Sequence, residues 1–127
     1  MSSFPSLRRW DRGTWLAYFQ AELDKLQRSL PEGADSFSPR RPTKQILDVA
    51  QQIADSLKQE ALPLPLVVAG SDGSLEIRWR LKLRELSFFV SPQAVEFLQV
   101  QGKGPIEEGT LKDPTHAQTL AKWLLAA

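Results

Sequence analysis

The segment 75-LEIRWRLKLR-84 decides the fold class of this 127-residue chain. Apolar residues fall at its odd positions and charged residues at its even positions, so the pattern repeats with a period of two. The odd positions hold Leu75, Ile77, Trp79, Leu81 and Leu83, and the even positions hold Glu76, Arg78, Arg80, Lys82 and Arg84. Because successive side chains of a strand point to opposite faces of a sheet, we expect a strand over 75–84 whose odd side chains enter the core and whose cations face water.

The residues on either side of this segment predict further strands of an antiparallel meander. The expected additional strands cover residues 66–69, 86–90 and 95–100. The turn 70-GSDGS-74 contains two glycines, which favour a chain reversal before residue 75. A tight reversal near Arg84-Glu85 would separate the segment from the strand that follows it. Residues 106–111 fit either a last strand or an extended connection, so we expect four to five strands.

Two N-terminal amphipathic helices are expected before the strands, and one C-terminal helix after them. The first covers 14–30, because its large apolar residues recur at spacings of three and four residues. The second begins after the N-cap Thr43 and runs to about Ala61, where 62-LPLP-65 cannot continue a helix. The third opens at Asp113-Pro114, with a capping carboxylate and a first-turn proline. Helices packed on the apolar face of an antiparallel sheet make an α+β fold.

The composition is that of one ordinary folded domain. Hydrophobic residues make up 42% of the chain and charged residues 24%, which is typical of a chain of this length with a single core. We therefore expect a single α+β domain over residues 14–127. Residues 1–13 mix serine, proline, glycine and arginine without a period, and we expect them to form a flexible N-terminal tail.

Charge and cysteine content exclude several classes of protein. The chain has 16 basic and 15 acidic residues, so its net charge of +1 gives no general attraction to nucleic acid or anionic lipid. It has no cysteine, which excludes disulfides and cysteine-rich zinc sites. We find neither a run of about 18 apolar residues nor the apolar stretch of a signal peptide, and we expect a cytoplasmic protein without a membrane partner.

The chain carries few groups that could perform catalysis. Its one histidine, His116, would need a serine nucleophile and Asp113 as an orienting group, but no G-x-S-x-G turn is present. Asp72-Gly73 lacks the alternating ligands of a calcium loop, and Glu107-Glu108 would point to opposite faces of a strand. The glycines of 102-GKGP-105 lack the ending of a phosphate-binding loop. We expect a protein that is not an enzyme, with no catalytic residue, metal site or cofactor; the enzyme alternative requires a pocket that holds His116 beside a carboxylate.

Aromatic residues outside the expected core indicate an interaction surface. Trp15 and Tyr18 lie off the apolar stripe of the helix over 14–30, and Trp10 precedes that helix. Phe89 is expected to point to the charged face of the sheet, opposite to Phe88. Exposed aromatic clusters are typical of protein interfaces. The leading hypothesis is a small protein-binding or self-associating module, although these aromatics could instead pack under the N-terminal tail or under the connection over 32–42.

The cations of the 75–84 strand support an alternative function. Arg78, Arg80, Lys82 and Arg84 would project from one face at intervals of about 6–7 Å, close to the phosphate spacing of a nucleic-acid strand. The alternative is therefore a nucleic-acid accessory protein that binds phosphates through this face. The simpler interpretation is that these cations are solvated cover on a strand with one wet face.

The segment from Pro42 to Val100 resembles a group of small uncharacterised bacterial proteins. The shared features are the helix-opening Pro42-Thr43, the strand prolines Pro63 and Pro65, the turn Asp72-Gly73, the strand residue Trp79 and the segment 85–90. The chain departs from this pattern at Arg78, where an acidic residue is common, and its first helix has no counterpart in the group. The resemblance implies a bacterial, cytoplasmic protein, and it carries no activity.

Overall fold

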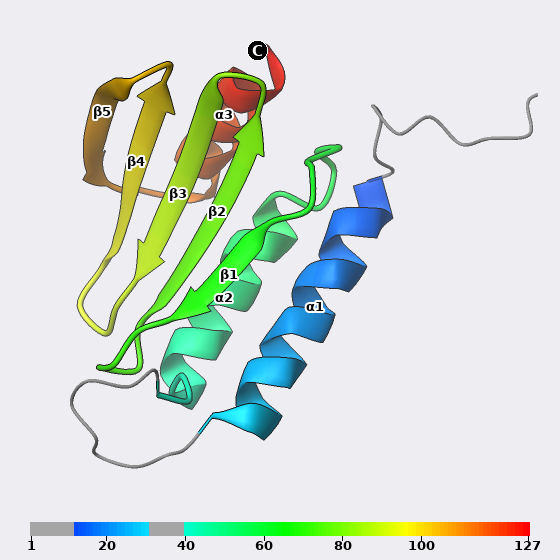
Figure 1. Ribbon diagram of the computed structural model, residues 1–127, viewed down its shortest axis with the longest axis vertical. Coiled ribbons are helices and arrows are strands. Elements are labelled where there is room, and N and C mark those ends of the chain that lie inside the picture. The colour runs from blue at the N-terminus through cyan, green and yellow to red at the C-terminus, as the bar shows by residue number, and fades with distance from the viewer. Residues whose placement is uncertain (1–11, 31–39) are drawn as a thin grey trace, which may run out of the picture.

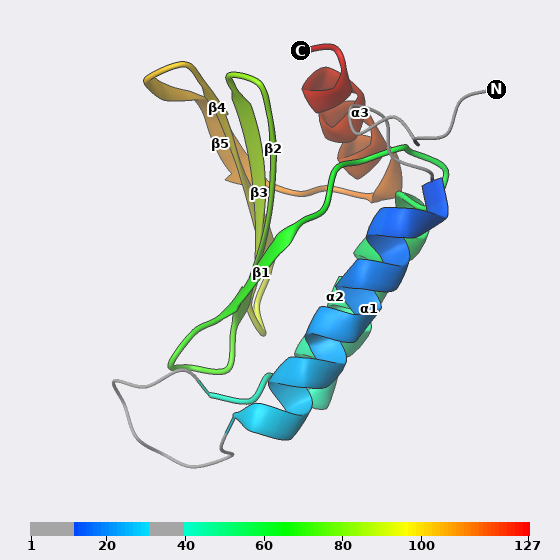
Figure 2. The ribbon, with the colours of Figure 1, turned by 45° about the vertical axis from the view of Figure 1, so that its right-hand side comes forward.

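A computed structural model describes residues 12–30 and 40–127, which form three helices and five strands. The helices are α1 (Arg12–Ser29), α2 (Lys44–Ser56) and α3 (Pro114–Leu125), and the strands are β1 (Leu66–Ala69), β2 (Leu75–Leu81), β3 (Arg84–Val90), β4 (Val95–Gln101) and β5 (Gly104–Thr110). The strands form one antiparallel sheet whose order follows the chain, so the meander and the α+β class are confirmed. The three helices lie on the same face of this sheet, and no described helix covers the opposite face (Figures 1 and 2).

The core lies between the sheet and the helices. Leu75, Ile77 and Trp79 of β2 are each 1% exposed, and they pair across the sheet with Val90, Phe88 and Leu86 of β3, which are fully buried. From the helix side, α2 contributes Ile46, Ala50, Ile53 and Ala54, and α3 contributes Ala117, Leu120, Ala121 and Leu124. The alternation of residues 75–79 therefore has the structural role that the sequence predicts, because one side of the strand is buried by helices.

Helix α1 is anchored to the core by aromatic side chains. Trp15 and Phe19 are completely buried, and the ring of Trp15 meets the ring of Trp79 edge to face at a centroid distance of 5.6 Å. On its other side, Trp79 contacts Phe88 in the same manner at 5.8 Å. Such edge-to-face pairs stabilise a core beyond the area that they bury. This aromatic cluster joins α1 to the two central strands.

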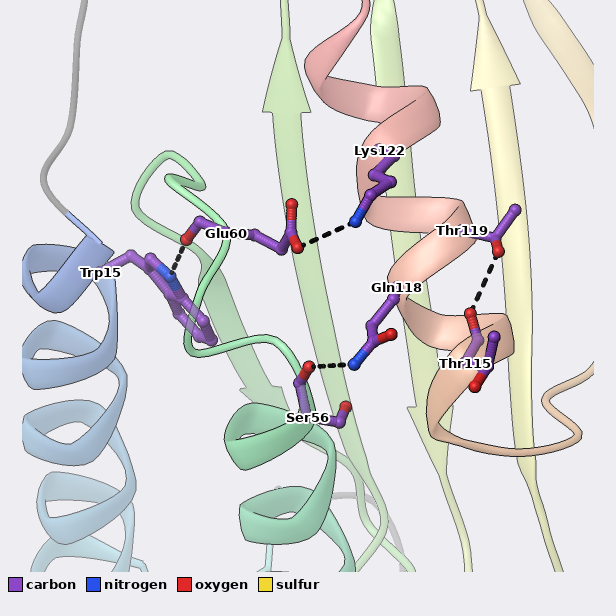
Figure 3. Close-up of polar contacts among 7 residues, drawn as sticks. All are labelled: Trp15, Ser56, Glu60, Thr115, Gln118, Thr119 and Lys122. Carbon is purple, nitrogen blue, oxygen red and sulfur yellow. Dashed lines mark hydrogen bonds and ion pairs between the residues drawn. The ribbon is translucent and has the colours of Figure 1, made fainter.

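The turn that follows α2 ties the three helices together. The indole nitrogen of Trp15 donates a hydrogen bond to the backbone oxygen of Glu60 at 2.9 Å, and the carboxylate of Glu60 pairs with Lys122 of α3 at 3.2 Å (Figure 3). Nearby, the side-chain amide of Gln118 donates to the backbone oxygen of Ser56 at 3.1 Å (Figure 3). The last residue of α2 and the turn after it thus supply hydrogen-bond acceptors to α1 and α3, which are far apart in sequence.

The expectation of two N-terminal amphipathic helices is correct only in part. Helix α1 begins at Arg12 rather than at Thr14, so the part of the expected tail that precedes it, up to residue 11, lies outside the described residues. Helix α2 begins well inside the chain and has the expected cap, since the hydroxyl of Thr43 accepts from the backbone nitrogen of Ile46 at 3.3 Å. It ends at Ser56 and not near Ala61, because the following turn carries both Leu57 and Leu62 into the core. The expected carboxylate cap of α3 is present.

The hairpin between β2 and β3 turns earlier than the alternating pattern suggests. The strand ends at Leu81, the turn consists of Lys82 and Leu83, and β3 begins at Arg84. Lys82 has a φ of +56°, the conformation that tight hairpins require, and Leu83 at the tip is 70% exposed. Leu83 is therefore not a core residue, and the expected reversal near Arg84-Glu85 is wrong. The reason is that a two-residue turn can form wherever one residue accepts a positive φ, which an alternating pattern does not reveal.

Replacing Lys82 with glycine is expected to raise the free energy of unfolding by about 0.5–1 kcal/mol, because glycine adopts a positive φ without the steric cost of a Cβ. Urea denaturation of the purified variant measures this gain. Lys82→Ala is the control, since it loses the exposed hydrogen bond from Lys82 to Ala127 equally but keeps the strained backbone. Equal stability of the two variants would contradict the interpretation.

Candidate functional site

The sheet face that no described helix covers is the candidate site, and we call it the open face. It is formed by Leu66 and Val68 of β1, Glu76, Arg78 and Arg80 of β2, Glu85, Ser87 and Phe89 of β3, Glu96, Leu98 and Val100 of β4, and Glu108 of β5. These side chains share a face because they occupy matching register positions, alternating with the buried set. The open face mixes apolar and charged groups, with apolar residues on β1, β3 and β4.

Phe89 stands between two hollows of the open face. One hollow has a volume of about 470 Å³ and is lined by Phe89, Glu96, Phe97, Leu98, Glu108 and Gly109. The other has a volume of about 140 Å³ and is lined by Val68, Ala69, Gly70, Ser74, Leu75, Glu76 and Phe89. On the helix side of the sheet, Gly109 pairs with buried Phe97, and a Cβ at position 109 would lie 3.2 Å from the Phe97 ring. Phe89 therefore forms a ridge, 37% exposed, with a depression on either side.

The charges of the open face are distributed unevenly. Arg78 binds Glu76 through its Nη2 at 2.6 Å and approaches Glu85 at 4.0 Å, so two carboxylates share one guanidinium. The hydrogen bond to Glu76 raises the pKa of Arg78 above its usual value. In contrast, no cation among the described residues reaches ion-pair distance of Glu96 or Glu108. The glutamates Glu76 and Glu85 thus lie near Arg78, whereas Glu96 of β4 and Glu108 of β5 have no ion-pair partner among the described residues.

The four cations of the predicted phosphate-binding face do not lie together. Arg78 and Arg80 are on the open face, but Arg84 is on the helix side of the sheet, where it donates to the backbone oxygen of Trp123 at 2.5 Å. Its guanidinium also lies 5.0 Å from the centre of the Trp123 ring. Lys82 is in the hairpin turn and donates to the backbone oxygen of Ala127 at 3.2 Å. The prediction of one shared strand face is wrong because the hairpin reverses the chain before Arg84.

The four aromatic residues of the predicted interface do not form one surface either. Trp15 belongs to the core, so the prediction that it is exposed is wrong, and its indole hydrogen bond to the turn after α2 explains why it is fully buried. Tyr18 is 38% exposed on α1, which packs on the helix side, whereas Phe89 is on the open face. Trp10 lies outside the described residues. Of the predicted set, only Phe89 belongs to the candidate site.

Two of the open-face residues that the sequence does not predict lie on β1. Leu66 and Val68 of β1 are 51% and 41% exposed, and they pair with Arg78 and Glu76 of β2. The segment 66-LVVA-69 is apolar throughout, so its composition does not show which side chains face outward. The register could have been found from the glycine turn at 70–74, which fixes the pairing of β1 with the alternating β2.

His116 has contacts that are structural rather than catalytic. Its Nδ1 accepts a hydrogen bond from the backbone nitrogen of Lys112 at 3.2 Å, and its ring meets Phe97 edge to face at 5.0 Å. The nearby carboxylate of Asp113 caps the helix by accepting from the backbone nitrogen of His116 at 2.8 Å. The carboxylate therefore acts on the backbone of His116 and does not orient its ring.

The described residues hold neither a cluster of metal ligands nor a membrane-spanning helix. Neither of the described ranges contains a group of three or more histidine, aspartate or glutamate side chains able to hold a metal ion. None of the described helices has both the length and the apolar character needed to cross a bilayer. No protein-family model, curated protein or solved structure matches the chain. Its function must therefore be inferred from its own surfaces.

Proposed function

We propose that this chain is a small, non-enzymatic protein-binding module that docks its partner on the open face around Phe89. The observation that carries this proposal is the one-sided packing: the helices bury one side of the sheet, while Phe89 is left half exposed between two hollows. Half-exposed Val68 and Leu66 extend the apolar area along β1. Exposed aromatic residues are enriched at protein interfaces and often supply most of the binding energy there.

Both sheet edges favour docking on the face over pairing along an edge. At one edge, β5 contains Pro105, two adjacent glutamates at 107 and 108, and a register shift opposite Gln99 and Val100. Proline, charge and bulges are features that protect an edge strand from pairing with another chain. At the other edge, β1 has only four residues and follows Pro65. These features make the addition of a strand at either edge less favourable than docking on the open face.

A photoreactive phenylalanine analogue at position 89, introduced into the full chain in the cells that produce it, tests the docking site. We expect ultraviolet light to give a discrete adduct of higher mass, which mass spectrometry then identifies. The matched control carries the same analogue at position 83, which is more exposed but lies at the hairpin tip. The absence of an adduct at 89, or the same adducts from both positions, would show that the open face is not the docking site.

A further inference from the structure

We propose that the partner of the open face is a segment of another protein that presents an arginine side chain to the larger hollow beside Phe89. This inference rests on the proposed function and names the chemistry of the partner. The arginine pairs with the carboxylates of Glu96 and Glu108 and lies against the ring of Phe89. Three observations support it, namely the charge balance of the face, the side chains around the hollow, and the contacts that an arginine of this chain already makes on the same face.

The unbalanced charge of the open face is confined to the half formed by β4 and β5, at one edge of the sheet (Figure 1). This half carries Glu96 and Glu108, and neither strand contains a lysine or an arginine. The other half is balanced, since its charged residues are Arg78, Arg80, Glu76 and Glu85. The net charge of the whole chain is only +1. Attraction of a cationic partner is therefore local to the β4–β5 half, and it does not come from the chain as a whole.

The side chains around the larger hollow can hold one guanidinium group. Glu96 lies directly across from Phe89 on the adjacent strand, and Glu108 lies directly across from Leu98. The two glutamates are diagonal neighbours, which lie roughly 7–8 Å apart, within the reach of long side chains. All four residues line the hollow of about 470 Å³. A guanidinium has donors on more than one edge, so it can bind both carboxylates while its plane rests on the ring of Phe89.

Arg78 shows how this sheet face binds an arginine. Its guanidinium is 2.6 Å from Glu76, two residues before it on β2, and 4.0 Å from Glu85 on the adjacent strand. Leu98 has the corresponding place on β4, because one of the unpaired glutamates lies two residues before it and the other lies on the adjacent strand. The chain thus provides two carboxylates here and an apolar side chain in place of the cation. An arginine of the partner supplies that cation, with its methylene groups against Leu98.

The chemistry of the hollow favours arginine over lysine, and its position favours a protein over a free small molecule. The planar guanidinium stacks on aromatic rings and is more weakly hydrated than an ammonium group. Glu96 and Glu108 are exposed, so a small molecule bound to them would keep much of its surface in water. A protein segment that continues across the face also covers Leu66 and Val68, which are half exposed on β1.

Titration calorimetry of the purified full chain with an oligo-arginine peptide tests the inference. We expect oligo-arginine to bind more tightly than oligo-lysine of the same length, and we expect oligo-glutamate not to bind. Glu108→Gln should raise the dissociation constant of oligo-arginine roughly two- to fivefold, the range of exposed ion pairs, and Glu96→Gln should do the same. Circular dichroism of each variant verifies that it is folded.

Glu107→Gln is the matched control for Glu108→Gln. It removes the same charge from the adjacent residue of β5, which lies on the opposite face of the sheet. We expect the dissociation constant of oligo-arginine to stay nearly unchanged in this variant. Equal losses from Glu107→Gln and Glu108→Gln would overturn the inference, because the peptide would then respond to the overall charge. Equal binding of the arginine and glutamate peptides would overturn it as well.

Phe89→Leu tests the contact between the guanidinium and the ring. Leucine keeps an apolar side chain at this position but has no aromatic face. We expect the variant to bind oligo-arginine roughly two- to fivefold more weakly, the range of an exposed cation–π contact, and to lose most of the preference for arginine over lysine. An unchanged preference would overturn the placement of an arginine on Phe89.

The photoreactive analogue at position 89 separates this inference from the docking function. We expect the cross-linked segment of the partner to contain an arginine. A discrete adduct with a segment that has no basic residue, or with a second copy of this chain, would overturn the inference and leave docking at the open face standing. The same holds if the chain gives the adduct but does not bind oligo-arginine. The absence of an adduct at position 89 would remove both.

Discussion

Replacing Trp79 with alanine is expected to lower the free energy of unfolding by about 3–5 kcal/mol, the range measured for large buried aromatic side chains. Trp79 is 1% exposed and lies between the rings of Trp15 and Phe88, so its removal leaves a cavity between α1 and the sheet. The neighbouring helix cannot fill this cavity without moving Trp15, whose indole nitrogen is bound to the turn after α2.

Urea denaturation followed by circular dichroism measures the loss at Trp79. Leu83→Ala is the control, because Leu83 belongs to the same alternating segment but is exposed, and we expect it to change the stability by less than about 0.5 kcal/mol. A loss below about 1 kcal/mol at Trp79, or equal losses in the two variants, would show that the odd positions of this segment do not hold the core.

Replacing Arg84 with alanine is expected to lower the free energy of unfolding by about 1–3 kcal/mol, since it removes a charge-assisted hydrogen bond and a cation–π contact. Both contacts are to Trp123 in the last turn of α3, whose backbone oxygen otherwise accepts a longer hydrogen bond, 3.3 Å, from the backbone nitrogen of Ala126. A cation at this end is also attracted by the negative end of the helix dipole, so its loss weakens the attachment of α3 to the sheet.

Arg80→Ala is the matched control for Arg84, because both arginines come from the β2–β3 hairpin but lie on opposite faces of the sheet. We expect Arg80→Ala to change the stability by less than about 0.5 kcal/mol, since no described residue forms a hydrogen bond or ion pair with it. Thermal denaturation of the two variants side by side provides the comparison. Similar losses would mean that the two side chains share an environment, which contradicts the register of the hairpin.

The sheet could be predicted because β2 has a sequence pattern that only a strand with one buried face satisfies. Alternation over residues 75–79 requires a strand with one wet face, and the glycines of 70–74 fix the reversal that precedes it. The position of the next reversal could not be predicted, because it depends on Lys82 accepting a positive φ. Because the turn comes at Lys82-Leu83, Arg84 lies on the helix side of the sheet, and the four cations do not form the predicted row.

The candidate site could be predicted at Phe89, Arg78 and Arg80, because each alternates along its strand with buried neighbours and therefore points to the other face of the sheet. Trp15 was misplaced because it adjoins the apolar stripe of its helix, and the position of such a border residue depends on contacts with Glu60 and Trp79. Those contacts join residues that are far apart in the chain, and no local pattern records them. Local spacing therefore identified α1 as a helix but did not show the full width of its buried side.

The one-sided core has a consequence for how this fold can diverge. Because the helices bury a single side of the sheet, the residues that stabilise the fold and the residues that face a partner are different sets on the same strands. Substitutions at the outward positions leave the buried packing intact and cost little stability. A scaffold of this kind can exchange one binding specificity for another through outward substitutions alone, without compensating changes elsewhere.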